Sequence, residues 1–217
     1  MKINKVIKTI FTIGAFILLP LSCSDSQPWI SYGFIQLVLY QSDEGPKEYF
    51  SFFVIAEDDE GPENLEDLYL YHDREQLRWH INSEDWVTIS HEEKTWIGTR
   101  GISIQQGSLP RGSFRAVLVN KGGESSQRVF NFDGAVRFPF PEITVSGGVY
   151  TVNSQWPVNR LVCYNREGDY AITITLESLS GRVSQLRLPS VVRTASLWVE
   201  DEDNFCSAFT DAVQLVQ

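Results

Sequence analysis

Residues 109–132 read LPRGSFRAVLVNKGGESSQRVFNF, two apolar runs on either side of a polar turn. Phe114, Ala116 and Leu118 occupy every second position, which is the spacing of a strand with one buried face. The run NKGGE is rich in turn-forming residues, and the chain returns through apolar residues 129–132. This segment therefore predicts an antiparallel β-hairpin.

The same kind of pattern recurs along most of the 217-residue chain. Short runs rich in aromatic and β-branched residues alternate with Gly, Pro, Asn and Asp, which is typical of strands and turns. We find no helical apolar stripe beyond the N-terminal segment. The sequence predicts strands at residues 31–40, 49–56, 67–72, 77–81, 86–89, 102–104, 114–120, 127–132, 144–145, 149–152, 160–164, 171–176, 183–188 and 195–200. An all-β fold built from sandwiches follows.

The run GAVRFPFP divides this series of strands. Pro139 and Pro141 cannot donate to a strand ladder and stiffen the chain into a connector. We therefore expect a signal peptide at residues 1–22 and a tether at residues 23–28. A first sandwich domain at residues 29–133, a linker at residues 134–141 and a second sandwich domain at residues 142–217 follow. The alternative is one larger sandwich in which residues 134–141 form an edge strand.

The hairpin at residues 109–132 resembles the last hairpin of immunoglobulin-like and fibronectin-III-like domains in bacterial surface proteins. The likeness consists of the turn at Pro110 and Gly112, an aromatic residue two positions later, an alternating strand and a Gly-containing turn. In those domains the aromatic residue is usually Tyr, whereas here it is Phe114. The resemblance implies two small immunoglobulin-like β-sandwiches and says nothing about activity.

The N-terminal segment has the features of an export signal. Three lysines precede an apolar stretch at residues 10–21, and Ser22 and Cys23 follow it. This arrangement resembles the lipobox of bacterial lipoproteins, although Pro20 stands where that family prefers Leu. The resemblance implies removal of residues 1–22 and attachment of fatty acyl chains to Cys23. The protein would then be anchored in a bacterial membrane, the outer membrane being expected ahead of the inner one. The alternatives are a membrane-spanning anchor and an unmodified Cys23.

The net charge limits the partners that we expect for this protein, and the cysteine content bears on its redox environment. The chain carries a net charge of −10, and loss of residues 1–22 removes three lysines and no acid. Such an acidic protein repels nucleic acid, so we expect no nucleic-acid partner. Cys163 and Cys206 can form a disulfide in an oxidising compartment or pack as two buried thiols. Both alternatives stay open.

We find no motif of a known catalytic or metal site. The chain has no G-x-S-x-G and no glycine-rich phosphate loop. His72 and His80 lie on one predicted hairpin, and an even-numbered loop sends them to opposite faces of the sheet. An odd-numbered loop would bring them to one face, where two histidines and a neighbouring acid could bind zinc, but nothing in the spacing requires such a site. The acidic runs at residues 57–67 and 200–203 lack the order of a calcium loop and are expected to be solvated. We therefore expect no catalytic residues, no metal and no cofactor.

Tryptophan offers the remaining signal for a binding site. Trp79 alternates with apolar neighbours and is expected in the core, whereas Trp86 and Trp96 flank the polar stretch VTISHEEKT. We therefore place the candidate ligand-binding edge at Trp86 and Trp96. The sequence favours a non-catalytic, lipid-anchored envelope protein that presents sandwich surfaces to a protein or a carbohydrate. The alternatives are an accessory subunit of an envelope assembly and a carboxylate-based glycan hydrolase.

Overall fold

The computed structural model describes residues 26–42, 44–91 and 94–215. The expected signal peptide at residues 1–22 and the expected lipid-attachment residue Cys23 lie outside these ranges. The described chain consists of strands joined by turns and four short 3-10 helices, which confirms the all-β fold class. Within the ranges described, no helix is both long and apolar enough to cross a membrane.

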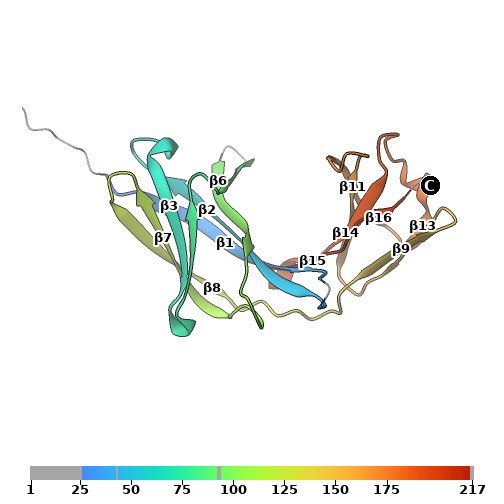
Figure 1. The fold of residues 1–217 in the computed structure, drawn as a ribbon, viewed down its shortest axis with the longest axis horizontal. Helices are drawn as coiled ribbons and strands as arrows, with labels where there is room; N and C mark the ends of the chain where they lie inside the picture. Colours follow the sequence, from blue (N-terminus) through green and yellow to red (C-terminus); the bar gives the residue numbers. More distant parts are fainter. Residues whose placement is uncertain (1–25, 43, 92–93, 216–217) are drawn as a thin grey trace, which may run out of the picture.

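A nine-stranded sheet runs through the length of the molecule (Figure 1). In spatial order it contains β12 (Tyr170–Thr175), β11 (Val158–Tyr164), β14 (Thr194–Asp201), β15 (Cys206–Phe209), β1 (Trp29–Tyr40), β2 (Lys47–Glu57), β6 (Lys94–Ile102) and β5 (Val87–His91), with β16 (Val213–Gln214) beside β14. Its neighbours are antiparallel except β1 and β15, which run parallel. This one parallel pairing joins the two halves of the sheet.

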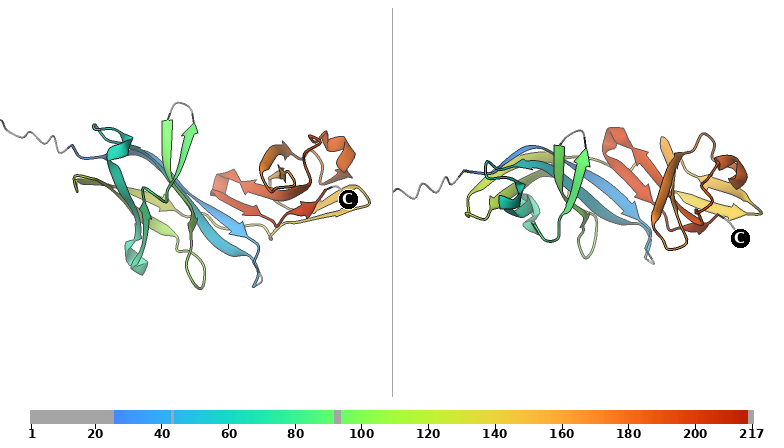
Figure 2. Two further views of the ribbon diagram at one scale, coloured as in Figure 1. Left: turned by 45° about the horizontal axis from the view of Figure 1, so that its top comes forward. Right: turned by 90° about the horizontal axis from the view of Figure 1, so that it is seen from above.

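Two smaller sheets cover one face of this long sheet. The first contains β4 (Leu77–Asn82), β3 (Leu65–His72), β7 (Gly112–Asn120) and β8 (Ser125–Phe132), and the second contains β13 (Ser180–Arg182), β10 (Val149–Asn153) and β9 (Glu142–Ser146). The four 3-10 helices are η1 (Pro62–Asn64), η2 (Asp73–Glu75), η3 (Val183–Leu186) and η4 (Glu202–Asn204). The four-stranded sheet packs on the half built from β1, β2 and β6, and the three-stranded sheet lies in the other half (Figure 2).

The predicted hairpin at residues 109–132 forms β7 and β8, and its alternation builds the first core. Phe114, Ala116 and Leu118 are fully buried. The ring of Phe114 lies 5.5 Å from the ring of Phe50 on β2, in an edge-to-face contact. Each fully buried apolar side chain of this size contributes about 1.5–3 kcal/mol to folding. The two sheets of this half are thus held together by aromatic packing.

Some of the expected strands are misplaced. The strand predicted at residues 102–104 overlaps a longer strand, β6, only at Ile102, and residues 103–104 lie outside it. Polar and glycine residues in β6 hid its period. The strand predicted at residues 183–188 is wrong, because η3 turns the chain there and Arg187 adopts a left-handed conformation with φ 52°. The prediction also missed β15, which begins directly after Phe205, a residue with φ 51°.

Residues 134–141, the segment expected to be a linker, join β8 to β9. Trp156 donates from Nε1 to the carbonyl oxygen of Pro139 at 2.8 Å, so this connector is packed against the second half. Leu37 on β1 donates its backbone N–H to the carbonyl oxygen of Phe205 at 2.8 Å, next to the β1–β15 ladder. The division into two domains stays a prediction, and the ladder gives the halves a shared sheet.

Candidate binding groove

The face of the nine-stranded sheet opposite to the two smaller sheets carries no second sheet in the part of the chain that the structure describes. Phe50 and Phe52 of β2 point toward the four-stranded sheet, where they contact Phe114 and Phe130. Because side chains alternate along a strand, Phe53 points to the opposite, open face. The register then places its cross-strand partners on that same face.

Aromatic side chains gather on this open face. We call the following set the aromatic face: Tyr32, Phe34 and Tyr40 of β1, Tyr49 and Phe53 of β2, Trp96 of β6, Tyr164 of β11, Tyr170 of β12, Trp198 of β14 and Phe209 of β15. The set comes from both halves of the chain, since β15 and β1 lie side by side. Burial of most of these rings is incomplete, so they meet the solvent along one side.

The rings of the aromatic face hold one another in place. The centroid of Tyr40 lies 5.9 Å from that of Phe209, and the centroid of Phe209 lies 5.7 Å from that of Trp198, both in edge-to-face geometry. In the first half, Trp96 makes edge contacts with Tyr32 at 5.7 Å and with Phe34 at 5.5 Å. Each such pair contributes about 0.5–1.5 kcal/mol beyond its buried area, so the surface is pre-organised.

A groove of about 550 Å³ opens over the aromatic face, between the two halves. Its floor comes from β1, β2, β14 and β15, and Ile89 and Arg100 of the β5–β6 hairpin stand on one side of it. Val162, Tyr164 and Tyr170 of β11 and β12 stand on the other side. Figure 1 shows these two hairpins rising on either side of the central strands. The groove therefore depends on the pairing of β1 with β15.

The groove combines apolar rings with a small number of polar groups. Arg100 is its one charged lining residue among the residues described, and its side chain is exposed. Burial raises the pKa of the Tyr40 hydroxyl, and burial also raises the pKa of the Tyr164 hydroxyl. Both hydroxyls therefore stay protonated at neutral pH and can donate hydrogen bonds. Arg160, just beside the groove, is paired with Glu200.

Trp86 and Trp96, the predicted binding edge, lie in different surroundings. Trp96 belongs to the aromatic face, where it contacts Tyr32 and Phe34. Trp86 is half-buried and packs against the core, and it does not line the groove. Most of the aromatic face was not predicted, although the spacing of two between Tyr32 and Phe34 in YGFIQLVLY is a signal for it. The contribution of Trp198 and Phe209 could not be found without the strand order.

The histidines occupy the faces that their spacing predicted. His72 pairs with Leu77 and His80 with Tyr69, so the two imidazoles point to opposite sides of the sheet. His72 is buried and accepts from the backbone N–H of Glu75 at Nδ1, so its Nε2 donates to the carbonyl oxygen of Arg111 at 3.1 Å. His80 is exposed and lies 2.6 Å from Asp67. His72 thus holds the turn before β7.

Cys163 and Cys206 are free, buried thiols in the structure. Both pair with β14, Cys163 opposite Ala195 and Cys206 opposite Asp201, so about 20 Å of strand separates them. A disulfide needs a Cα separation of about 4.4–6.8 Å. This fold therefore excludes a bridge between them, and the alternative of two packed thiols describes them. Burial raises the pKa of each thiol to about 11, which makes them poor nucleophiles.

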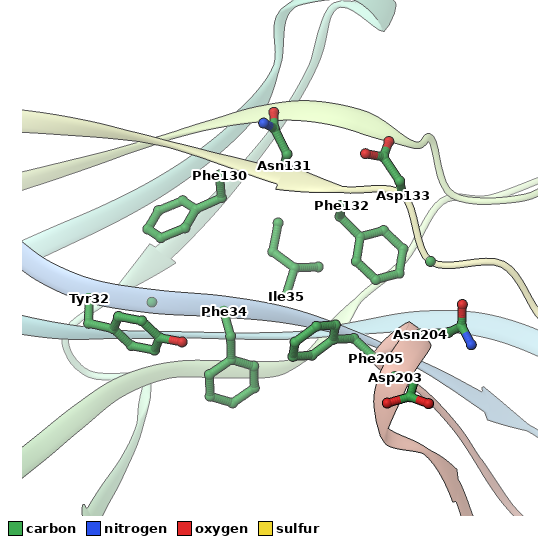
Figure 3. A pocket seen from close by; sticks show the side chains of 12 residues that line it. Tyr32, Phe34, Ile35, Phe130, Asn131, Phe132, Asp133, Asp203, Asn204 and Phe205 are labelled. Carbon is green, nitrogen blue, oxygen red and sulfur yellow. The ribbon is translucent and has the colours of Figure 1, made fainter.

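A second, smaller cavity of about 390 Å³ lies where the edge of β1 meets the edge of β8 (Figure 3). Phe130 fills part of this space, since a Cβ added at Gly33 would lie 2.8 Å from its ring. Arg128 of β8 donates to the carbonyl oxygens of Ile30 and Ser31, which closes the β1 edge further. Because side chains of β8 already contact this edge of β1, we regard the groove on the aromatic face as the stronger candidate.

No protein-family model matches the chain, and no curated protein matches it. Among solved structures, the chain is similar to "Tp47, the 47-Kilodalton Lipoprotein of Treponema pallidum", with a TM-score of 0.44 and 14% sequence identity. The match covers 85% of this chain and 50% of that one, so this chain spans about half the length of the solved structure. A structural neighbour is thus a bacterial lipoprotein, and a likeness at this level carries no conclusion about function.

Proposed function

We propose that this protein is a non-catalytic, lipid-anchored recognition protein of the bacterial cell envelope, and that it binds a protein or a carbohydrate in the groove over the aromatic face. The observation that carries the proposal is that aromatic rings from both halves of the chain line one open groove. A sheet face of this kind is normally either covered or polar. An open aromatic face therefore indicates a site for a binding partner.

The exposure of individual rings supports the proposal. Tyr170, which lines the groove, is 65% exposed, and Tyr32, elsewhere on the aromatic face, is 55% exposed. Tyrosine, tryptophan and arginine are the residues that most often supply binding energy at recognition surfaces. The groove volume of about 550 Å³ lies within the range of about 300–1,000 Å³ that is usual for ligand sites.

The anchor belongs to the same proposal. Cys23 is the proposed lipid-attachment residue, and fatty chains at that position would hold the protein at a membrane through about 0.8 kcal/mol for each buried CH₂ group. The chain enters the fold at Ser26, whose carbonyl oxygen accepts from Asn120 Nδ2 at 3.0 Å, at the end of the first half remote from the second half (Figure 1). An anchor there would leave the groove and the second half directed away from the bilayer.

Retention of envelope material tests the groove. The purified protein is immobilised and exposed to an extract of envelope proteins and glycans from its own cells. A double variant, Tyr170→Ala with Trp198→Ala, should lose the material that the wild type retains. Val129→Ala, an exposed substitution on the four-stranded sheet, should keep it. Equal retention by all three proteins, or none by the wild type, would contradict the proposal.

Mass spectrometry tests the anchor. The protein isolated from its own cells should begin at Cys23 and carry additional fatty acyl mass. The Cys23→Ser variant should keep its leader and lose the acyl mass. A wild-type protein of unmodified mass would show that the anchor is wrong while leaving the groove untouched.

A further inference from the structure

We propose that the groove over the aromatic face binds an acidic oligosaccharide, with a sugar carboxylate on Arg100 and pyranose rings against the tyrosine and tryptophan rings. This inference rests on the proposed function and specifies its ligand.

The shape of the groove favours a chain-like ligand. The β5–β6 hairpin and the β11–β12 hairpin contribute lining residues on its two sides, so the site is a hollow and not a flat surface. A stable protein interface typically buries about 800 Å² on each partner, which a globular partner reaches by lying on a broad surface. A groove of about 550 Å³ better accommodates a few linked sugar rings.

The rings present the surface that sugars bind. A pyranose ring has faces made of C–H groups, and these carry the partial positive charge that the negative face of an aromatic ring attracts. Tyr170 is highly exposed, and Trp198 and Phe209 are half-buried with one side toward the groove. The edge-to-face contacts of Phe209 with Tyr40 and Trp198 fix these rings before a ligand arrives. Little conformational entropy is then lost on binding.

Polar groups around the rings match the hydroxyl groups of a sugar. The hydroxyls of Tyr40, Tyr164 and Tyr170 and the side chains of Gln36 and Ser51 line the same groove. They offer both donors and acceptors at the borders of the apolar rings. The Tyr164 hydroxyl already bonds to Ser196. A purely apolar partner would cover the other polar groups without offering hydrogen bonds, at a cost of about 1–3 kcal/mol for each group that becomes buried. A sugar can pack its C–H faces on the aromatic rings and form hydrogen bonds with the polar groups at the same time.

The charge of the groove favours an acidic sugar. Arg100 is exposed in the groove, and among the described residues no carboxylate lines the groove or pairs with Arg100. In a chain with a net charge of −10, a groove whose described lining holds one arginine and no acid is a local exception. By contrast, Arg160 outside the groove is held by Glu200 and lies 3.7 Å from Glu202. The guanidinium fork of Arg100 is suited to bind a carboxylate through two parallel hydrogen bonds.

Titration calorimetry on the full chain, purified in detergent, tests this inference. The probes are hexasaccharides of polygalacturonate and hyaluronan, each compared with its carboxyl-reduced form. We expect the acidic forms to bind at least tenfold more tightly than the reduced forms, and binding to weaken as salt is added. Arg100→Gln should lower the affinity for the acidic forms at least tenfold. Arg74→Gln is the matched control, since the Arg74 side chain is 88% exposed on the turn at η2. The affinity of this variant for the acidic forms should stay within twofold of the wild-type affinity.

The outcomes separate the ligand from the site. Equal binding of acidic and reduced sugars, or an unchanged affinity in Arg100→Gln, overturns the inference and leaves a sugar-binding groove. Failure of every probe to bind also overturns it. If the envelope extract is nevertheless retained through Tyr170 and Trp198, the proposed function stands with another ligand, such as a protein. If the wild-type protein does not retain envelope material through Tyr170 and Trp198 either, both the inference and the proposed function are wrong.

Discussion

Phe114 carries no hydroxyl that could tie the corner before β7, and the structure shows which residues hold this corner. Its ring is fully buried, and its centroid lies 4.8 Å from that of His72. His72 bonds to the carbonyl oxygen of Arg111 in the turn before β7. The corner is therefore tied by an imidazole from β3 and packed by a phenylalanine from β7.

Replacing Phe114 with Ala should lower the free energy of unfolding by about 3–5 kcal/mol, because the cavity left between the sheets cannot collapse around Phe50. Urea denaturation followed by tryptophan fluorescence measures this change. Val129→Ala is the control, since Val129 is 58% exposed and should change the free energy by less than about 0.5 kcal/mol. Similar losses in both variants would mean that this core is assigned wrongly.

Asp67 should give the protein a small, pH-dependent increment of stability. The hydrogen bond from His80, helped by Asn82, lowers the pKa of the Asp67 carboxyl. A carboxyl with a lowered pKa in the folded state stabilises that state above about pH 4, its unfolded pKa, and loses this effect as the pH falls through the folded value. Asp67→Asn should therefore be less stable than wild type by about 0.5–1 kcal/mol at pH 6, since the pair is partly exposed.

The difference between wild type and Asp67→Asn should shrink as the pH falls below about 4 and the carboxyl becomes protonated. Urea unfolding measured from pH 7 to pH 3 tests this dependence. The exposed Asp211→Asn should show no such trend. A difference that stays constant over the whole range would contradict the role given to Asp67.

At the scale of single elements, β6 is the strand that closes the groove on one side, and Gly98 lets it do so. A Cβ at Gly98 would collide with the carbonyl oxygen of Phe52 and lie 2.8 Å from the Cα of Phe53, both on β2. Backbone atoms cannot move aside as the end of a flexible side chain can. The close pairing of β6 with β2 thus requires glycine at this position.

Gly98→Ala should lower the free energy of unfolding by about 3 kcal/mol, because overpacking against the backbone forces β6 away from β2. Gly101→Ala, in the same strand, should be tolerated, since the nearest atom to its Cβ is Thr99 Oγ1 at 3.8 Å. Thermal unfolding by circular dichroism compares the two variants. Equal melting temperatures would show that β6 does not approach β2 as described.

The predictability of the elements depends on how they are buried. The strands β3, β4 and β7 have one buried face and one exposed face, so their alternation could be read from the sequence. Most of β6 was missed because it contains Gly98 and Gly101 and polar residues on both faces. The strand β15 was missed because it is four residues long and mostly buried, and such a run has no period.

The candidate site was harder to predict than the strands. Trp96 was identified from its polar neighbours, but the sequence could not show that it shares a face with Trp198. Their common face depends on the parallel contact of β15 with β1, which joins residues more than 160 positions apart, such as Leu37 and Cys206. Pairings between distant segments leave no local pattern in the sequence. The groove could therefore be found only from the strand order.

The shared sheet should make the two halves of the molecule unfold together. The β1–β15 ladder and the ring contact of Tyr40 with Phe209 connect the halves over the floor of the groove. Differential scanning calorimetry should show one transition whose calorimetric and van't Hoff enthalpies agree. Two separated transitions would show that the halves are independent and that the groove lies across a weak junction.

The claim on which the account depends is that the groove over the aromatic face binds a partner in the envelope. Hydroxyl-radical footprinting with mass spectrometry, on membranes from the protein's own cells and on the purified protein, tests it most directly. We predict that Tyr170 and Trp198 are oxidised less in the membranes than after purification, while Leu179, which is 40% exposed outside the groove, is oxidised equally in both. Equal oxidation of Tyr170 and Trp198 in the two samples would contradict the account.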